Sequence, residues 1–300
     1  MRGFMRFTIV ASATVLQLAA QAPAAAGVHR YFLGKLEVIS LQDGLFQLPI
    51  SLLTGIKPEE AKAMLGGKDI SPTPVNAFLV RMPHRLVLVD TGAGNGAGEA
   101  AGHLPERLKA AGVDPAKIDL VLITHFHMDH VGGLLKADGT RAFPNAVLRV
   151  SQAENDFWTG DPAKVPERSR KQLPALKAIV VAYAAAGAYK PFAPGESLGE
   201  DIRVLPTYGH TAGHACYAFA SEGKELWCLG DLIHFGAVQF PRPSVAVAFD
   251  WDSTLAIASR QELFQKAAQT HAVLAGAHLA FPGLFKLEPN GEGYSAIAVN

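Results

Sequence analysis

A segment of six residues contains four side chains of types that commonly bind metals: His125, His127, Asp129 and His130. The apolar residues 120–123 come directly before them and predict a buried strand. A loop that leaves such a strand lies at the edge of a sheet, where these side chains can converge on a metal. Neutral imidazole together with carboxylate suits Zn²⁺ and similar divalent ions. A solvated polar loop does not require four such groups at this spacing, so residues 125–130 predict a metal site.

Three further candidate ligands also stand where apolar runs stop. His210 follows the strand-like residues 202–206, Asp231 follows residues 226–229, and His278 follows residues 272–275. A single His or Asp after a strand is more often a turn residue or a hydrogen-bonded core group. The ordered combination is far more specific, and it predicts an α/β or layered-sheet protein whose site lies at strand ends.

This order of motifs resembles the metallo-β-lactamase superfamily, and within it the methyl parathion hydrolase branch, which borders the quorum-quenching lactonases. The resemblance runs from about residue 30 to the C-terminus. It rests on Val89-Asp90-Thr91-Gly92, Gly209-His210-Thr211, Gly230-Asp231-Leu232-Ile233, Asp156-Phe157-Trp158 and the residues 277–283. It implies the α/β class, a four-layer αββα sandwich and a homodimer.

The resemblance also implies two metal positions. His125, His127 and His210 would hold one ion, Asp129, His130 and His278 the other, and Asp231 would bridge them. Zn²⁺ is the expected metal, and Mn²⁺, Co²⁺ and Fe²⁺ suit the same ligands.

Such a site explains hydrolysis without a Ser or Cys nucleophile. Two divalent ions bring four positive charges; Asp129, Asp231 and a bridging hydroxide remove three, which leaves about one to polarise a carbonyl or phosphoryl oxygen. Water between two metals loses a proton near neutral pH and becomes the nucleophile. This scheme does not depend on a serine nucleophile of the Gly-x-Ser-x-Gly type.

Three residues beside the ligands have expected roles. Asp90 would accept a ring N–H from a metal-bound histidine and fix its orientation. His214 has a counterpart in the superfamily that is usually structural. His234 stands where related lactonases carry a Tyr near the substrate oxygen; it is either a catalytic hydrogen-bond donor or a wall residue without a catalytic role.

The N-terminus predicts export. Arg2 and Arg6 precede an apolar stretch over residues 7–20, and small residues at 24–26 offer a cleavage site before Gly27. We therefore expect a signal peptide over residues 1–26 and a single hydrolase domain over residues 27–300, located in the periplasm or secreted. No second apolar run is long enough to span a membrane.

The charge balance bears on whether the protein binds nucleic acid. Lys+Arg and Asp+Glu both number 27, so nothing indicates binding of nucleic acid.

Cys216 and Cys228 flank a predicted turn at residues 221–224 and are expected to be buried free thiols, with a disulfide as the alternative.

Hydrophobic periodicity outlines the remaining elements. It predicts strand hairpins around Asp43-Gly44 and around Pro83-His84, and helices over residues 59–65, 104–111, 168–186 and 254–268. The apolar candidates for the pocket wall are Trp158, Leu52, Leu53, Phe235 and Phe240. The loop after Thr91 is rich in Gly and Ala, which predicts a wide pocket mouth.

These observations favour a hydrolase of small-molecule lactones or aryl esters, with cleavage of phosphotriesters as a side activity. The alternatives are an organophosphate hydrolase of the methyl parathion type, a β-lactamase, a glutathione thioesterase and a metal-binding scaffold protein. Asp231 argues against a β-lactamase, and the complete ligand set argues against a scaffold. His127 stands where di-iron relatives carry an acidic residue, which argues against redox chemistry.

Overall fold

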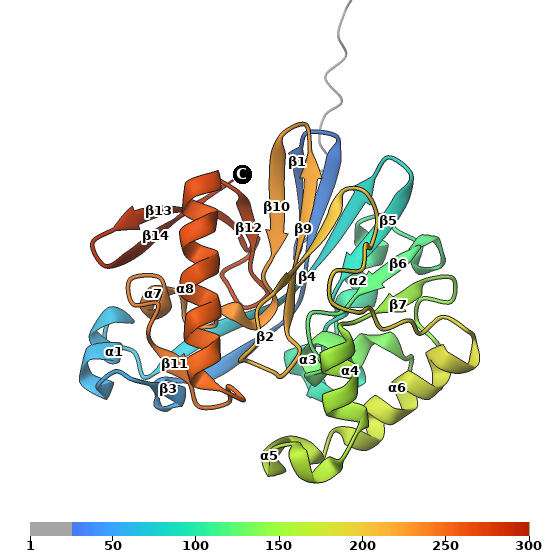
Figure 1. Ribbon diagram of the computed structural model, residues 1–300, viewed down its shortest axis with the longest axis horizontal. Coiled ribbons are helices and arrows are strands. Elements are labelled where there is room, and N and C mark those ends of the chain that lie inside the picture. The colour runs from blue at the N-terminus through green and yellow to red at the C-terminus, as the bar shows by residue number, and fades with distance from the viewer. Residues whose placement is uncertain (1–25, 300) are drawn as a thin grey trace, which may run out of the picture.

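Two mixed β-sheets pack face to face in the computed structural model, which describes residues 26–299 (Figure 1). The first sheet has the order β1 (Val28–Leu33), β2 (Leu36–Pro49), β4 (Ile70–Met82), β5 (Arg85–Val89), β6 (Leu120–Leu122) and β7 (Val147–Arg149). The second has the order β14 (Gly293–Ala298), β13 (Leu284–Asn290), β12 (Val273–Ala275), β10 (Lys224–Cys228), β9 (Ala215–Ser221) and β8 (Ile202–Pro206). The short strands β3 (Leu53–Thr54) and β11 (Ala246–Val247) pair beside them.

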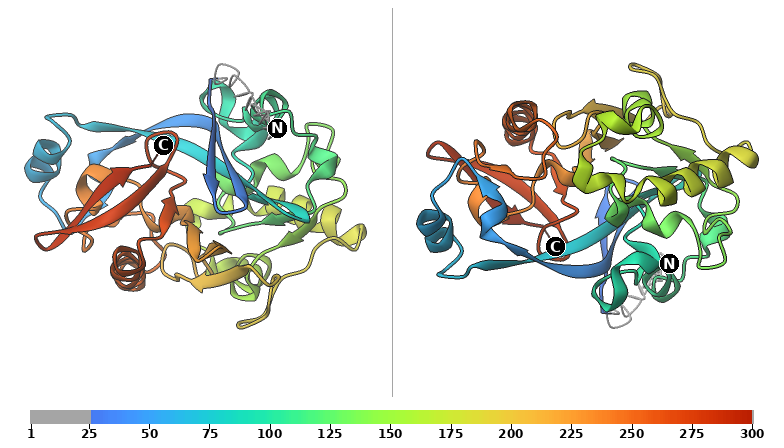
Figure 2. Two further views of the ribbon diagram at one scale, coloured as in Figure 1. Left: turned by 90° about the horizontal axis from the view of Figure 1, so that it is seen from above. Right: turned by 90° about the horizontal axis from the view of Figure 1, so that it is seen from below.

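Helices cover the outer faces of both sheets. The helices of the described chain are α1 (Pro58–Met64), α2 (Leu104–Ala110), α3 (Met128–Val131), α4 (Gln152–Thr159), α5 (Glu167–Arg170), α6 (Leu173–Ala185), α7 (Gly236–Gln239) and α8 (Ser253–Thr270). Helices α2, α4 and α6 pack on the first sheet and α8 packs on the second, with the strands between them (Figure 2). The predicted four-layer αββα sandwich is confirmed.

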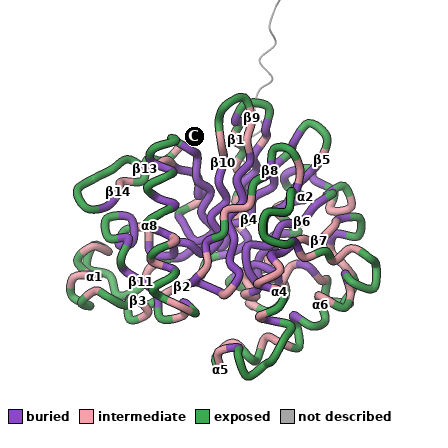
Figure 3. Tube along the Cα trace, viewed as in Figure 1, coloured by how far each residue is buried: buried purple, intermediate pink, exposed green. Residues whose placement is uncertain are grey.

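Alternation along the strands assigns side chains to separate cores. In β4, Phe78 and Val80 point between the sheets, whereas Ala77 and Leu79 point toward the helices. Successive side chains of a strand face opposite sides of its sheet, so a strand buried on both faces is apolar throughout. The buried segments accordingly follow the central strands, and the exposed ones follow the hairpin tips (Figure 3).

The predicted hairpin around Asp43-Gly44 is wrong. These residues lie inside one long strand, β2, whose pairing with β4 shifts register between Gln42 and Gly44. Asp43 is buried there and accepts three backbone N–H groups, from Ala93, Gly102 and Leu104. A Cβ on Gly44 would come within 2.3 Å of the Ala100-Ala101 backbone, so close packing requires the glycine. The pair marks a β-bulge rather than a turn.

The predicted helix over residues 168–186 is divided into α5 and α6. Pro174 lies in the first turn of α6. Proline has no N–H to donate and its ring collides with the carbonyl group four residues earlier, so the helix of α5 cannot continue through it. The predicted hairpin around Pro83-His84 and the other three helices are present at nearly the predicted bounds.

Cys216 and Cys228 are buried free thiols, as predicted. Strands β9 and β10 form a hairpin, but Cys228 pairs with Tyr217, one residue beyond Cys216. Because a shift of one residue turns a side chain to the other face, the two thiols lie in different cores.

The predicted export signal lies outside the described residues, apart from its last residue, Ala26. Among the helices within residues 26–299, none has the length and apolar character that a membrane span requires.

Candidate metal centre

The seven predicted ligands meet at one edge of the sandwich. His125 and His127 lie on the loop after β6, and Asp129 and His130 lie in α3. His210 follows β8, Asp231 lies in a 3-10 turn after β10, and His278 follows β12. Both sheets therefore contribute, and strand ends far apart in the sequence supply one site.

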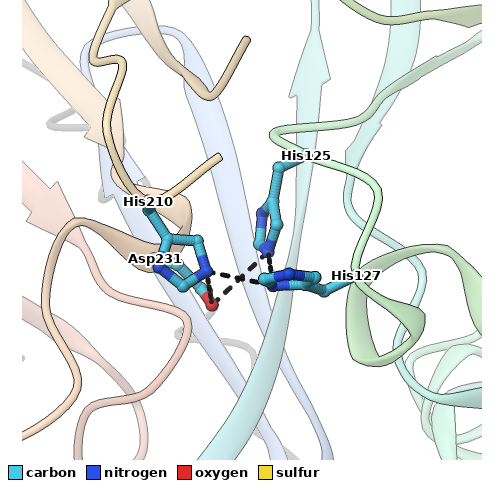
Figure 4. A group of neighbouring side chains, drawn as sticks. All are labelled: His125, His127, His210 and Asp231. Carbon is cyan, nitrogen blue, oxygen red and sulfur yellow. Dashed lines mark hydrogen bonds and ion pairs between the residues drawn. The ribbon is translucent and has the colours of Figure 1, made fainter. Parts of the chain in front are cut away.

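The first group consists of His125, His127, His210 and Asp231, which point toward one another (Figure 4). His127 Nδ1 lies 3.0 Å from Nε2 of both His125 and His210. Asp231 Oδ2 lies 3.4 Å from His125 Nε2 and 3.1 Å from His210 Nε2. Atoms bound tetrahedrally to zinc at about 2.1 Å lie roughly 3.4 Å apart, so this spacing suits one such ion.

The second group consists of Asp129, His130 and His278. The other carboxylate oxygen of Asp231, Oδ1, lies 2.9 Å from His130 Nε2 and 3.0 Å from His278 Nε2. Asp129 Oδ2 lies 3.5 Å from His278 Nε2. Asp231 thus presents one oxygen to each group, which is the geometry that the bridging assignment requires.

Acceptors outside the site fix the orientation of the histidine rings. His130 Nδ1 lies 2.8 Å from Asp90 Oδ2, His210 Nδ1 lies 2.9 Å from Asp250 Oδ1, and His278 Nδ1 lies 2.8 Å from the carbonyl oxygen of Pro74. Each Nδ1–H donates outward, so in the neutral ring the Nε2 lone pair faces inward.

Asp90 orients two of the ligand histidines, which extends its predicted role. Besides accepting from His130, it accepts the hydroxyl hydrogen of Thr124 at 2.9 Å. The Thr124 oxygen is then free to accept the Nδ1–H of His125 at 3.1 Å. Asp90 has a left-handed backbone with φ of 60°, which aspartate tolerates better than most residues.

Burial and charge divide the histidines into two sets. Burial lowers the pKa of His125 well below its usual value and that of His127 to about 3, so both rings are neutral. Burial also opposes protonation of His210, but Asp231 and Asp250 outweigh it and raise the pKa of His210 to about 9. The carboxylates of Asp231, Asp129 and Asp90 likewise outweigh burial and raise the pKa of His130 well above its usual value.

The donor set fits two divalent ions. With the Nδ1–H groups committed outward, the inward lone pairs of His130, His210 and His278 face the carboxylate oxygens of Asp231. Lone pairs at such distances repel unless positive charge lies between them. Protons supply that charge in the metal-free protein, and metal ions replace them on binding.

Glu154 is a buried carboxylate that sequence reasoning missed. It accepts the backbone N–H of Phe126 at 2.8 Å, between the ligands His125 and His127. It also accepts the Thr211 hydroxyl at 2.7 Å and the Gly213 N–H at 2.9 Å, on the loop that carries His210. One carboxylate therefore ties together the two loops of the first ligand group. It stands on α4 within no recognisable ligand motif, so spacing gave no signal for it.

Trp158 links the same carboxylate to His127. Its indole N–H donates to Glu154 at 2.6 Å, and its ring packs edge-on against His127 with ring centroids 5.7 Å apart. Asp250, the partner of His210, was also missed, because no motif marks it beyond its place between Phe249 and Trp251.

His234 lies beside the bridging carboxylate. Its Nε2 lies 3.0 Å from Asp231 Oδ2, and its ring stacks on His278 with centroids 4.9 Å apart. Its Nδ1 is buried and has no hydrogen-bond partner among the described residues. Burial lowers the pKa of His234 to about 4, although Asp231 opposes the shift, so the ring is neutral.

His214 holds the backbone of Asp231 in place. Its Nδ1 lies 2.8 Å from the Thr207 hydroxyl, and its Nε2 accepts the Asp231 N–H at 2.9 Å. Both ring nitrogens are occupied, which confirms the structural role expected for this residue.

A cavity of about 250 Å³ opens onto the ligands. It is lined by Phe46, Leu48, Thr73, His127, Asp129, Arg168, Ser169, Asp231, His234, Phe249 and His278. The apolar wall residues are thus Phe46, Leu48 and Phe249, and α5 contributes Arg168 and Ser169 at the rim.

The predicted wall residues do not line this cavity. Leu53 and Phe235 are buried in one small core, Phe240 is buried in the core beneath α8, and Trp158 lies behind His127. Leu52 packs against the first of these cores. The Gly-rich loop after Thr91 also lies away from the cavity, because it packs against Asp43. Apolar sequence runs do not distinguish a wall from a core, which explains these errors.

Comparison with known proteins agrees with this geometry. The family model described as the metallo-beta-lactamase superfamily matches residues 70–278. The crystal structure of AbOPH, a hydrolase in the beta lactamase superfamily, superimposes with a TM-score of 0.87 at 31% identity, and the match covers 93% of this chain and 99% of that one. AidC, described as a dizinc quorum-quenching lactonase, superimposes with a TM-score of 0.84 at 29% identity, over 91% of this chain and 98% of that one.

A relative from Bacillus subtilis (strain 168), the uncharacterized protein YobT, is 27% identical over 219 residues, which cover 70% of this chain and 86% of that protein. The family match spans more than half of this chain, and the predicted resemblance to lactonase-like structures is confirmed. The chain therefore belongs to the metallo-beta-lactamase superfamily, and its converging His and Asp donors are those of a metal-dependent hydrolase.

Proposed function

We propose that this protein opens lactones or cleaves aryl esters at a dinuclear metal centre, with zinc as the expected metal. The observation that carries the proposal is the two-sided position of Asp231, with one oxygen toward each ligand group. The similarity to AidC, a dizinc quorum-quenching lactonase, supports lactones as substrates.

The ligands, the groups that orient them and the apolar wall would have separate roles in the reaction. The seven ligands would hold two divalent ions, and these would supply the Lewis acidity needed to activate water and to polarise an ester carbonyl. Asp90, Asp250 and the Pro74 carbonyl hold the ligand rings in one orientation, which reduces rearrangement during the reaction. Phe46, Leu48 and Phe249 give an acyl or aryl group an apolar wall and exclude water from it.

We further propose that His234 assists departure of the alkoxide when a lactone opens. Its ring borders the cavity next to Asp231, and its Nε2 lies 3.0 Å from Oδ2 of that carboxylate. A carboxylate only accepts hydrogen bonds, so the neutral ring carries its hydrogen on Nε2, and this N–H is the donor that a leaving alkoxide beside Asp231 would share. The alternative is that His234 only forms part of the wall.

The test is a substrate panel on metal-reconstituted protein. It comprises γ- and δ-lactones, aryl esters, phosphotriesters and a chromogenic cephalosporin. We expect turnover of lactones or aryl esters that is lost on chelation and restored by Zn²⁺. Efficient turnover of phosphotriesters alone would indicate an organophosphate hydrolase, and turnover of the cephalosporin alone would indicate a β-lactamase; either result would refute the proposal.

A further inference from the structure

Arg168 places a positive charge on the rim of the cavity that holds the metal ligands. It stands on α5, and its side chain is exposed. Its only hydrogen bond in the described chain is a long one, 3.4 Å from Nη2 to the carbonyl oxygen of Asp250. Most of its N–H donors are therefore available to a ligand.

No carboxylate neutralises this guanidinium within the described residues. Arg149, Arg203 and Arg242 each pair with a glutamate, but no Asp or Glu oxygen lies within 4.0 Å of Arg168. Its neighbour Arg170 is used differently, because it donates to the backbone carbonyls of Val165 and Ala163 on its own loop. Of the two arginines of α5, only Arg168 lines the cavity.

The size of the cavity brings this charge within reach of a substrate. At about 250 Å³, it holds only a small molecule. Histidines and aspartates of the metal site form one part of its lining, and Phe46, Leu48 and Phe249 form an apolar part. Arg168 contacts the carbonyl of Asp250, next to the wall residue Phe249, so a substrate whose ester group lies at the metal ligands can reach α5 along this wall.

We propose that the substrate is an ester or lactone that carries a carboxylate remote from the scissile bond, and that Arg168 binds this carboxylate. The proposal rests on the ester-hydrolase function proposed above and specifies its substrate class. A guanidinium presents paired N–H groups in a planar fork that matches the two oxygens of a carboxylate. Arginine keeps its charge at any physiological pH, so recognition does not depend on titration of this residue.

The experiment compares two esters with the same leaving group on the zinc-loaded protein. One is the mono-p-nitrophenyl ester of glutaric acid, which has a free carboxylate; the other is the matching ester of glutaramic acid, which is neutral. Arg168→Gln is expected to lower kcat/KM for the acid by about tenfold and to change kcat/KM for the neutral ester by less than about twofold. Arg170→Gln is the control, because it removes the same charge from the same helix and Arg170 does not line the cavity.

Equal effects of Arg168→Gln on both esters, or an equal effect of Arg170→Gln on the acid, would overturn the proposal. A second measurement keeps it separate from the proposed function. Glutarate should raise the melting temperature of the zinc-loaded wild type more than its monoamide, glutaramate, does, because either compound can place one carboxylate on zinc but only glutarate has a second one for Arg168. Arg168→Gln should abolish the difference. If neither ester is hydrolysed but this difference is present, the ester-hydrolase function fails and carboxylate binding stands. If the difference is missing, or persists in Arg168→Gln, carboxylate binding by Arg168 is refuted.

Discussion

His210 Nδ1 lies 2.9 Å from Oδ1 of Asp250, which stands 40 residues further along the chain. This contact directs the other nitrogen of the ring toward Asp231, where Nε2 lies 3.1 Å from Oδ2. A ring held between two carboxylates keeps its proton, which is why the pKa of His210 rises to about 9 despite the opposing effect of burial. A metal ion at the same position must displace that proton.

Metal binding should therefore release protons. In the metal-free protein, the surrounding carboxylates outweigh burial and raise the pKa values of His130, His210 and His278. Zn²⁺ added to chelator-treated protein near pH 7 should therefore release about two to three protons per chain, and its affinity should rise as pH increases. Calorimetric titration in buffers of different ionisation enthalpy measures the release. Binding without proton release would contradict this account of the ligands.

The same shift predicts how the stability of the metal-free protein depends on pH. The pKa of His210 rises from its ordinary value of 6.5 to about 9 on folding. The folded state then binds this proton more tightly than the unfolded state, so the stabilisation is complete below pH 6.5 and is lost as pH rises through about 9. The melting temperature of chelated protein should fall across this window, whereas that of zinc-loaded protein should not. A flat profile for chelated protein would count against the raised value.

Glu154→Gln should weaken metal binding at the first ligand group. The amide cannot accept all four N–H and O–H groups that the carboxylate accepts, so the loops of His127 and His210 lose their common anchor. Loss of an outer partner of this kind typically costs about tenfold to a hundredfold in metal affinity. Chelator competition with Co²⁺, whose absorption spectrum reports its ligands, would measure the loss at each position.

Asp43→Asn is the matched control for Glu154→Gln. Asp43 is also a buried carboxylate that accepts several N–H groups, but it contacts none of the ligands. Asp43→Asn should lower the melting temperature of the protein without changing its metal affinity. If both variants lose stability alike and neither loses metal affinity, Glu154 has only a structural role.

His234→Leu should lower the turnover of lactones but not that of activated aryl esters. An alkoxide leaving group gains from a hydrogen-bond donor, whereas p-nitrophenolate is already stable near neutral pH. We expect lactone turnover to fall by roughly a hundredfold and aryl ester turnover to remain nearly unchanged. Metal content should stay at the wild-type level, because the seven ligands are intact. Parallel losses on both substrates, or no loss on either, would reduce His234 to a wall residue.

The sequence was most informative for residues whose type and position are both restricted by metal ligation. His125, His127 and Asp231 each stand near the end of an apolar run, and a metal accepts few other residue types, so residue type and position predicted that these side chains converge. The same reasoning predicted Asp90 as an acceptor for a ligand histidine, which the contact with His130 confirms.

Sequence reasoning failed where a role depends on contacts between distant segments. Glu154 acts on residues 28 and 57 positions away, and nothing local distinguishes it from a solvated glutamate on a helix. Asp43-Gly44 has the composition of a turn, but packing against the Ala100-Ala101 backbone makes it a bulge within a strand. Tertiary contacts decide such cases, and periodicity does not report them.

The metal content of wild-type protein and of Asp231→Ala tests the central claim most directly. Within residues 26–299, Asp231 is the one carboxylate that faces both ligand groups, so its removal would leave two cations without their shared counter-charge. Elemental analysis should find about two metal ions per chain in the wild type. The variant should lose at least one of them together with nearly all hydrolytic activity. Two tightly held metals and full turnover in Asp231→Ala would contradict the account.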